Sequence, residues 1–376
     1  MKQTELLKSD LKYLLSELVQ MPTITAEKAT NQAALDWIKY QLRELPLHVY
    51  EFQHNGYGTL ILTTQPTKHP KVLLSAHIDV IPADDPKEFE FREDDSRYYG
   101  RGVFDMKFAV ATYMQLLLEL GDELKNYDFG VIFTTDEEAT GGVDGAGRIV
   151  AAGWGADVVI DPDAITPAWA IQKAGKGFWR YRIKSEGQSG HGSRTWIYRN
   201  AIAQLMDYLR DLSGRFPSEP CGDPKHVHHT LNIGTIQGGQ VANQIAESAH
   251  ADIDMRVVPG FTQQRVEGML AEIAQNYPHI SYEFLSGSEW VELDMNLECV
   301  QRMQAIITQV TGEANEPHLA HGASEANYYA AKGIPVILFE CPGGNNHAVG
   351  EWIDKKGLDQ FAEIITKFVE QEARIG

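Results

Sequence analysis

The sequence predicts an α/β fold in which a mainly parallel sheet, flanked by helices, is interrupted by a smaller α+β domain. Up to about residue 177, apolar strand-like runs alternate with helix-like segments, as in sheets built from crossover connections. From Phe178 to about Ser288 the order becomes strand, helix, strand, strand, helix, strand. A helix and a buried strand then return. We therefore expect residues 1–177 and 289–376 to form one discontinuous domain and residues 178–288 an inserted one.

The elements expected in the first domain follow from hydrophobic periodicity. Helices need apolar residues three or four positions apart, whereas buried strands are short, continuous apolar runs. The expected helices cover residues 1–21, 31–45, 107–120 and 147–154, and the expected strands cover 58–65, 71–81, 129–138 and 156–164.

The inserted segment alternates apolar and polar residues, as half-exposed strands do. Its expected strands cover residues 178–187, 229–239, 248–258 and 280–287, and its expected helices cover 200–213 and 262–277. After it, we expect a helix over 295–312, a buried strand over 334–341 and a terminal helix. The final strand is expected to complete the first domain's sheet.

Composition excludes several classes of function. The 33 Lys and Arg against 52 Asp and Glu give a formal charge of −19, which argues against nucleic acid or an anionic membrane as partner. No apolar run approaches the roughly 18 residues of a membrane span, and the amphipathic start does not resemble a signal peptide. The three cysteines, Cys221, Cys299 and Cys341, are widely spaced, so we expect neither a disulfide framework nor a thiolate zinc site. These features predict a cytoplasmic protein.

Histidines and carboxylates recur where the expected strands end. Because parallel strands present their carboxyl ends at one edge of a sheet, such residues converge in space. Mixed imidazole and carboxylate ligands suit zinc or a similar divalent ion, and a pair of ions requires a bridging carboxylate. Such a pair polarises a carbonyl group and promotes hydrolysis. The candidates are His77, Asp79, Asp105, Glu137, Glu138, Asp161, Asp163 and His347.

Each candidate taken alone also has an ordinary interpretation. A single histidine at a strand end is usually just hydrogen-bonded, the adjacent Glu137 and Glu138 are typical of a solvated turn, and Asp161 could cap the segment that starts at Pro162. The combination supports a metal site. Two rival functions remain: a binding protein without turnover on the same fold, and a metal-free carboxylate hydrolase, such as a glycosidase, that uses Glu137.

The order of motifs resembles the dinuclear zinc aminoacylase and exopeptidase family, which includes acetylornithine deacetylase, succinyl-diaminopimelate desuccinylase, carboxypeptidase G and several dipeptidases. The resemblance spans nearly the whole chain. It is carried by SAHIDVIP, GRGVFDMK, TTDEEATGG, VVIDPDA, GQSGHGS, GGQVANQIAESAHADIDMR, HGASEA and NNHAVGEWI. It implies a metallopeptidase catalytic domain interrupted by a lid or dimerisation domain. The implied substrate is a small N-acyl amino acid or short peptide, and the implied cofactors are two divalent ions, zinc first, with cobalt or manganese as alternatives.

The resemblance also implies a role for each metal-site residue. Asp105 would bridge the two ions and precede a cis peptide bond. The ligands of one ion would be His77 and an acid of VVIDPDA, and those of the other Glu138 and His347. Glu137 would be the general base, and Asp79 the partner that orients His77. Both Asp161 and Asp163 match forms of the ligand motif, and we prefer Asp161 because it ends the strand.

Further residues are implied for substrate binding. His191 of GHGS resembles a histidine that reaches a neighbouring subunit's active site to stabilise the oxyanion, which implies a homodimer. Asn243 and Arg256 resemble substrate-binding positions, and His321, at the start of the small-residue turn HGASEA, is another candidate. One departure concerns SDAR, which many relatives carry. The stretch Ser324 to Asn327 lacks its arginine, which could hold a substrate carboxylate through a bidentate contact.

Overall fold

A computed structural model describes residues 10–163, 167–216, 227–320, 322 and 324–376. The chain divides into two compact units. Unit 1 comprises Met1–Ala174, Glu292–Ala320 and Ser324–Gly376, and unit 2 comprises Gly175–Val291 and His321–Ala323. The α/β fold class is confirmed: unit 1 contains a mixed, mainly parallel sheet, and unit 2 a separate antiparallel sheet.

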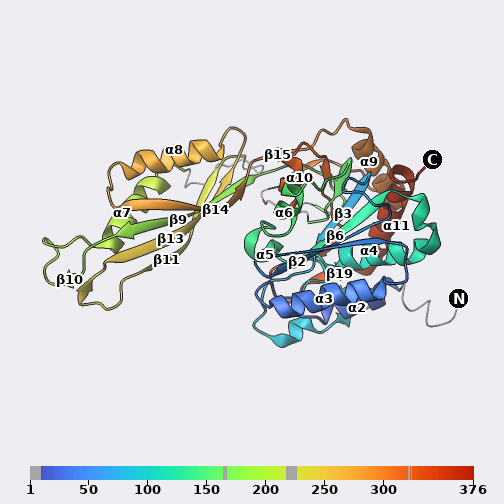
Figure 1. Ribbon diagram of the computed structural model, residues 1–376, viewed down its shortest axis with the longest axis horizontal. Helices are drawn as coiled ribbons and strands as arrows, with labels where there is room; N and C mark the ends of the chain where they lie inside the picture. The colour runs from blue at the N-terminus through green and yellow to red at the C-terminus, as the bar shows by residue number, and fades with distance from the viewer. Residues whose placement is uncertain (1–9, 164–166, 217–226, 321, 323) are drawn as a thin grey trace. The chain divides into compact units, whose positions relative to one another are not determined.

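The central sheet of unit 1 has the strand order β1-β2-β6-β3-β7-β17 (Figure 1). β3 is parallel to both β6 and β7, and β17 is parallel to β7, whereas β2 pairs antiparallel with β1 and β6. The strands are β1 (His48–His54), β2 (Tyr57–Thr63), β3 (Val72–His77), β6 (Phe129–Thr134), β7 (Val158–Ile160) and β17 (Val336–Ile337).

Helices cover both faces of this sheet. Along β3, Val72 and Leu74 belong to one hydrophobic cluster and Leu73 to another, because successive strand side chains point to opposite faces. The larger cluster includes side chains of α2 (Leu11–Val19), α3 (Lys28–Gln41), α4 (Lys107–Leu120), α9 (Glu298–Thr311) and α11 (Lys355–Glu372). The smaller one includes side chains of α6 (Ala146–Ala151) and α10 (Ala326–Ala330).

Shorter elements complete the secondary structure. Two small sheets have the strand orders β18-β19-β5-β4 and β15-β8-β16. Their strands are β4 (Arg92–Glu93), β5 (Arg97–Tyr99), β8 (Gln172–Gly175), β15 (Val291–Glu292), β16 (His318–Ala320), β18 (Gly343–Gly344) and β19 (Trp352–Asp354). The short helices are η1 (Pro86–Phe89), η2 (Gly121–Asn126) and α5 (Glu137–Thr140). No helix of the described residues has the length and apolarity needed to cross a membrane.

Unit 2 has a four-stranded antiparallel sheet in the order β11-β13-β9-β14, with α7 and α8 on one side (Figure 1). Asn200 caps α7 by accepting two backbone N–H groups of the first turn, and Thr262 caps α8 by accepting one. Buried residues of both helices pack on the sheet in a separate hydrophobic cluster. The elements are β9 (Gly177–Glu186), β10 (Gly190–His191), α7 (Ala201–Ser213), β11 (Thr230–Gly238), β12 (Gln244–Ile245), β13 (Ser248–Val257), α8 (Gln263–Ala274) and β14 (Ile280–Ser288).

Candidate metal centre

Three neighbouring parallel strands bring the candidate ligands to one edge of the central sheet. β3 ends at His77, which pairs in register with Thr134 at the end of β6. Glu137 lies shortly after β6, and Asp161 and Asp163 follow β7 on the other side of β3. Since the three strands run in the same direction, their carboxyl ends meet where open α/β sheets usually bind ligands.

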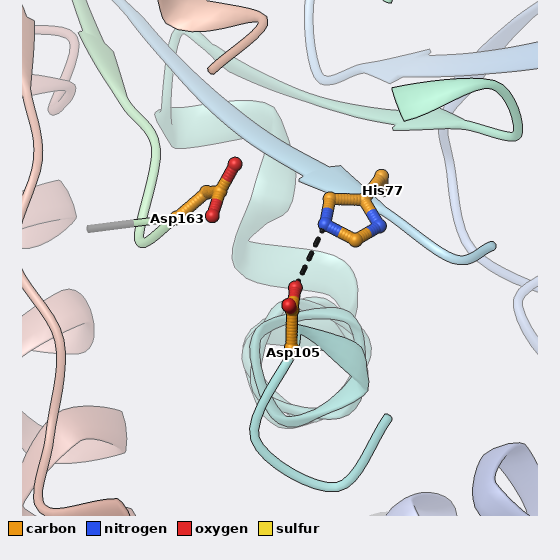
Figure 2. Close-up of side chains that lie close together, drawn as sticks. All are labelled: His77, Asp105 and Asp163. Atoms are coloured by element: carbon orange, nitrogen blue, oxygen red, sulfur yellow. Dashed lines mark ion pairs between the residues drawn. The ribbon is translucent and has the colours of Figure 1, made fainter. Parts of the chain in front are cut away.

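His77, Asp105 and Asp163 form a first group of potential metal ligands. One ligand atom of each lies within 4.8 Å of the others. Figure 2 shows the His77 ring and the Asp105 carboxylate facing each other, with Nε2 3.1 Å from Oδ1. The other ring nitrogen, Nδ1, lies 3.0 Å from the backbone oxygen of Asp79. An imidazole held in this way presents Nε2 to a metal.

Asp105, Glu138 and His347 form a second group, also within 4.8 Å. His347 Nε2 lies 3.1 Å from Asp105 Oδ2 and 2.9 Å from Glu138 Oε2. Asp105 therefore belongs to both groups and turns a different oxygen toward the histidine of each. Its peptide bond to Met106 is cis, as predicted.

The donor set fits a pair of divalent ions. Each group combines one imidazole with two carboxylates, which is the chemistry that zinc favours among the common divalent ions. The carboxylate of Asp105 is shared between the groups and could serve as the bridging ligand that a two-ion site requires. The residues of both groups would hold the ions.

Burial and mutual repulsion shift the pKa values of the carboxylates in this cluster. Burial raises the pKa of Asp163 to about 7, and the nearby charge of Asp105 adds to the shift. Burial alone would raise the pKa of Asp105, but the hydrogen-bonding imidazoles of His347 and His77 hold it below its ordinary value. Hydrogen bonding with Asp105 and Glu138 raises the pKa of His347 to about 10. A bound cation would relieve the repulsion among these carboxylates.

The geometry favours Asp163 over Asp161 as the third member of the first group, contrary to our preference from the sequence. Asp163 lies with His77 and Asp105, whereas Asp161 belongs to neither group. Asp161 is fully buried, and its carboxylate oxygens have no hydrogen-bond partner among the described residues. Both aspartates follow the end of the strand at Ile160, and of the two only Asp163 lies within ligand distance of His77 and Asp105.

Asp79 lies behind His77 and supports the turn that carries the two glutamates. Its Oδ1 accepts the backbone N–H of Glu137 at 3.2 Å, and its Oδ2 accepts that of Glu138 at 3.2 Å. The hydroxyl of Thr25 donates to Oδ2 at 2.7 Å. Burial raises the pKa of Asp79 to about 7, although the neighbouring His77 opposes the shift.

Glu137 lies beside the ligand groups without belonging to either. It is the first residue of α5, and its neighbour Glu138 is in the second group. Burial and the charge of Asp163 raise the pKa of Glu137 well above its usual range. A carboxylate close to two cations but outside their ligand sets is placed to accept a proton from water.

Two buried glutamates near the cluster were not predicted from the sequence. Glu325 accepts hydrogen bonds from the hydroxyls of Ser75 at 2.8 Å and Thr134 at 2.7 Å, and so links the ends of β3 and β6. Glu351 binds the backbone of the turn before Asp105. The hydrogen-bond partners of Glu325 and Glu351 lie roughly 190 to 250 residues away in the sequence, so local patterns could not reveal them. Their only signal in the sequence was their place within the motifs HGASEA and NNHAVGEWI.

Unit 2 carries the other candidates. His191 of β10 pairs with Gln244 of β12, and the N–H of Gly192 donates to the backbone oxygen of Asn243, so His191 and Asn243 are neighbours. Arg256 lies near the opposite end of β13, where it donates to Asp254 at 2.8 Å. The structure thus brings two of the three together. His321 lies outside the described residues.

Comparison with known proteins identifies the family. Residues 73–371 match the sequence pattern described as "Peptidase family M20/M25/M40". The chain belongs to this family. It is therefore a metallohydrolase of a family whose members act as deacylases and peptidases, and the resemblance inferred from the motifs is confirmed.

Relatives in the family carry several activities in their names. The chain is 26% identical to a succinyl-diaminopimelate desuccinylase of Caulobacter vibrioides over 368 residues, which cover 93% of this chain and 92% of the relative. It is 25% identical to an acetylornithine deacetylase of Pectobacterium carotovorum over 316 residues, 79% of each chain. It is 24% identical to a probable carboxypeptidase of Emericella nidulans over 72% of this chain and 69% of that one. Names at this level of identity do not select one substrate.

Solved structures share the fold. An M20 family metallo-carboxypeptidase from Sulfolobus solfataricus superposes with a TM-score of 0.75, covering 96% of this chain and 98% of that one at 18% identity. A tripeptidase from Staphylococcus aureus gives a TM-score of 0.73, with 97% and 98% coverage at 18% identity. At this identity the comparison supports the fold alone.

Proposed function

We propose that this protein hydrolyses the amide bond of a small N-acyl amino acid or short peptide, using two divalent ions, zinc first. The observation that carries the proposal is the carboxylate of Asp105, which faces His77 with one oxygen and His347 with the other. Two ions with a common ligand lie about 3.5 to 4 Å apart in hydrolases of this kind. Membership of a family of deacylases and peptidases supports the same reaction.

The ligands of the two ions would come from the two groups. His77, Asp105 and Asp163 would hold one ion, and Asp105, Glu138 and His347 the other. When bound, the ions supply Lewis acidity, which polarises the carbonyl group and lowers the pKa of water. Asp79 would keep the imidazole of His77 in place through its carboxylate, which lies 3.6 Å from Nδ1. It would also hold the start of α5 by accepting the N–H of Glu137.

Glu137 would act as the general base and then as the general acid. It removes a proton from the attacking water as the new carbon–oxygen bond forms at the carbonyl carbon. It then delivers that proton to the nitrogen as the carbon–nitrogen bond breaks, which releases a carboxylic acid and an amine. Burial raises the pKa of Glu137 above its usual range, and proton transfer in both directions is most efficient when the pKa of the catalytic group lies near the working pH.

The active form would be a homodimer. His191 lies beyond the Ser248 end of β13, whereas Arg256 lies at its other end. Eight residues of strand separate these ends by about 26 Å. One copy of unit 2 therefore cannot place both side chains on one small substrate, and the arrangement favours His191 acting at the site of a second copy.

The proposed function is tested by amine release from a panel of N-acyl amino acids and dipeptides, measured before and after chelation. We expect release from at least one substrate, loss of that activity with the metal, and recovery on adding zinc. A metal-free glycosidase would keep its activity in the chelator, and a binding protein would retain the metal and release no amine. Either result would overturn the proposal.

A further inference from the structure

Glu351 is a fully buried carboxylate whose two oxygens are both occupied by donors from one short turn. Its Oε1 accepts the backbone N–H groups of Phe104 at 2.9 Å and Asp105 at 3.0 Å. Its Oε2 accepts the N–H of Gly102 at 3.0 Å and Nη1 of Arg101 at 3.0 Å. The carboxylate therefore acts as the template around which the turn before the bridging aspartate is folded.

Arg101 extends this contact to a second loop. Its guanidinium group is buried and donates through Nη1 to Glu351 and through Nη2 to the backbone oxygen of Ala348 at 3.0 Å. The N–H of Gly100 donates to the backbone oxygen of Glu351 at 3.1 Å. The turn that carries Asp105 and the loop that carries His347 are thus tied together through both the side chain and the backbone of Glu351.

The loop of His347 depends on such ties for its position. His347 and Asn345 have φ angles of 59° and 60°, a left-handed conformation that is uncommon for non-glycine residues, although Asn and His adopt it more often than most. The side chain of His347 is 54% exposed, so it is not fixed by burial. Asn345 Nδ2 donates to the backbone oxygen of Gly350 at 3.2 Å. The N–H of Gly350 in turn donates to the carboxylate of Glu88 at 2.8 Å.

We propose that Glu351 is a positioning residue that, together with Arg101, fixes Asp105 relative to His347 and thereby sets the affinity of the ion held by Asp105, Glu138 and His347. The inference rests on the proposed function, in which this group binds an ion. Glu351 itself binds no metal, because each of its oxygens already accepts two donors.

Loss of the contacts made by Glu351 should weaken the binding of one ion more than that of the other. The other group also uses Asp105, but its remaining ligands, His77 and Asp163, follow strands β3 and β7 and make no contact with Glu351 among those described. Supporting residues around metal ligands typically contribute about 10-fold to 100-fold in affinity. We therefore expect a loss of this size for one ion and a much smaller loss for the other.

The test is a calorimetric titration of zinc into metal-free full-length protein, comparing wild type with Glu351→Gln and Arg101→Lys. The amide introduced by Glu351→Gln would turn an NH₂ group toward existing donors, and a lysine at position 101 cannot reach both Glu351 and Ala348 with a planar fork. The matched control is Glu93→Gln, an exposed acid paired with Lys12 and Lys355 at the surface. Thermal unfolding of each metal-free protein reports whether the fold is intact.

We expect two binding events in wild type and in Glu93→Gln, and an affinity lowered about 10-fold to 100-fold for one event only in Glu351→Gln and Arg101→Lys. Unchanged affinities in a folded variant would overturn the inference, as would an equal loss at both sites. If Glu351→Gln fails to fold, Arg101→Lys decides between these results. Absence of zinc uptake by the wild type would instead refute the proposed function.

Discussion

At the scale of single residues, Glu137 and Glu138 show how the fold places two neighbouring acids differently. Both N–H groups donate to Asp79, which fixes the two side chains on one turn. Glu138 then lies 2.9 Å from His347 within a ligand group, whereas Glu137 remains outside both groups. Both side chains are carboxylates of the same length. Which of them belongs to a ligand group therefore depends on where each points from the turn.

Replacing Glu137 by Gln is expected to abolish most turnover while leaving the metal content unchanged. The amide keeps the size of the side chain but cannot accept the proton of water, and general acid–base catalysis is worth about 10²-fold to 10⁴-fold. Turnover of the best substrate and elemental analysis of the same sample measure the two effects. Glu138→Gln is the matched control and should lose metal instead; full activity in Glu137→Gln would exclude it as the base.

The choice between Asp161 and Asp163 leads to a second prediction. Asp163→Asn should weaken binding of one ion by about 10-fold or more, because it removes a charged ligand from the first group. Asp161→Asn should retain both affinities, since Asp161 lies outside the groups. Zinc titration of the two metal-free variants measures this. The reverse pattern would show that the sequence-based preference for Asp161 was right.

Single residues were predicted from the sequence to different degrees. His77 and Glu138 were named because each follows an apolar run, and Asp105 and His347 because each stands in a motif of the family that the chain resembles. Glu325 and Glu351 were not, since their roles arise from hydrogen bonds across roughly 190 to 250 positions of sequence. Asp161 and Asp163 are two residues apart, so alternation along a strand places them alike, and only the path of the loop distinguishes them.

At the scale of elements, the buried strands and helices are those with continuous apolar surfaces. β3 and β6 are buried along their whole length, and α4 is apolar on most sides, in keeping with its place between the sheet and other helices. These three were predicted within a few residues. β1 was not, because His48–His54 is a mostly exposed edge strand with no apolar run.

The contact between α4 and α11 gives a prediction of stability. Phe361 of α11 is fully buried, with its ring centroid 4.9 Å from that of Phe108 and 5.5 Å from that of Phe339. Phe361→Ala is expected to lower the free energy of unfolding of unit 1 by about 3–5 kcal/mol, through lost burial and the cavity created. Urea denaturation followed by far-UV circular dichroism measures it.

The control for this prediction is Tyr40→Ala on α3. Tyr40 is 59% exposed, so its replacement should change the free energy of unfolding by no more than about 0.5 kcal/mol. A loss in Phe361→Ala as small as that expected for Tyr40→Ala would mean that the packing of α11 on α4 contributes less than its burial suggests.

At the scale of the whole molecule, the chain forms two units with separate hydrophobic cores. The two core clusters of unit 1 surround its sheet, and a third lies between the sheet and helices of unit 2. The sequence led us to expect domain limits at 177/178 and 288/289, and the two units divide at Ala174/Gly175 and Val291/Glu292, with residues 321–323 grouped with unit 2. The continuous apolar runs of the first domain give way to apolar–polar alternation near the point where the core of unit 1 is replaced by that of unit 2.

Metal removal is expected to destabilise unit 1 selectively. Both groups of potential ligands lie in unit 1, and the described residues of unit 2 contain no such group. A ligand present at 100 times its dissociation constant adds about 2.7 kcal/mol to the stability of the folded state that binds it. Hydrogen exchange with mass spectrometry, with and without chelator, should show faster exchange around β3 and α5, and unchanged exchange in β9 and β13. Equal acceleration in both units would contradict this assignment.

The most direct test of the two-ion site is the number of zinc ions per chain at which amine release reaches its maximum. Metal-free protein would be titrated with zinc while release from the best N-acyl amino acid or dipeptide is followed. We predict no release without metal and a plateau at about two ions per chain, as a site with a shared carboxylate requires. Release by the metal-free protein, or no zinc uptake at all, would contradict the site on which the proposed function rests.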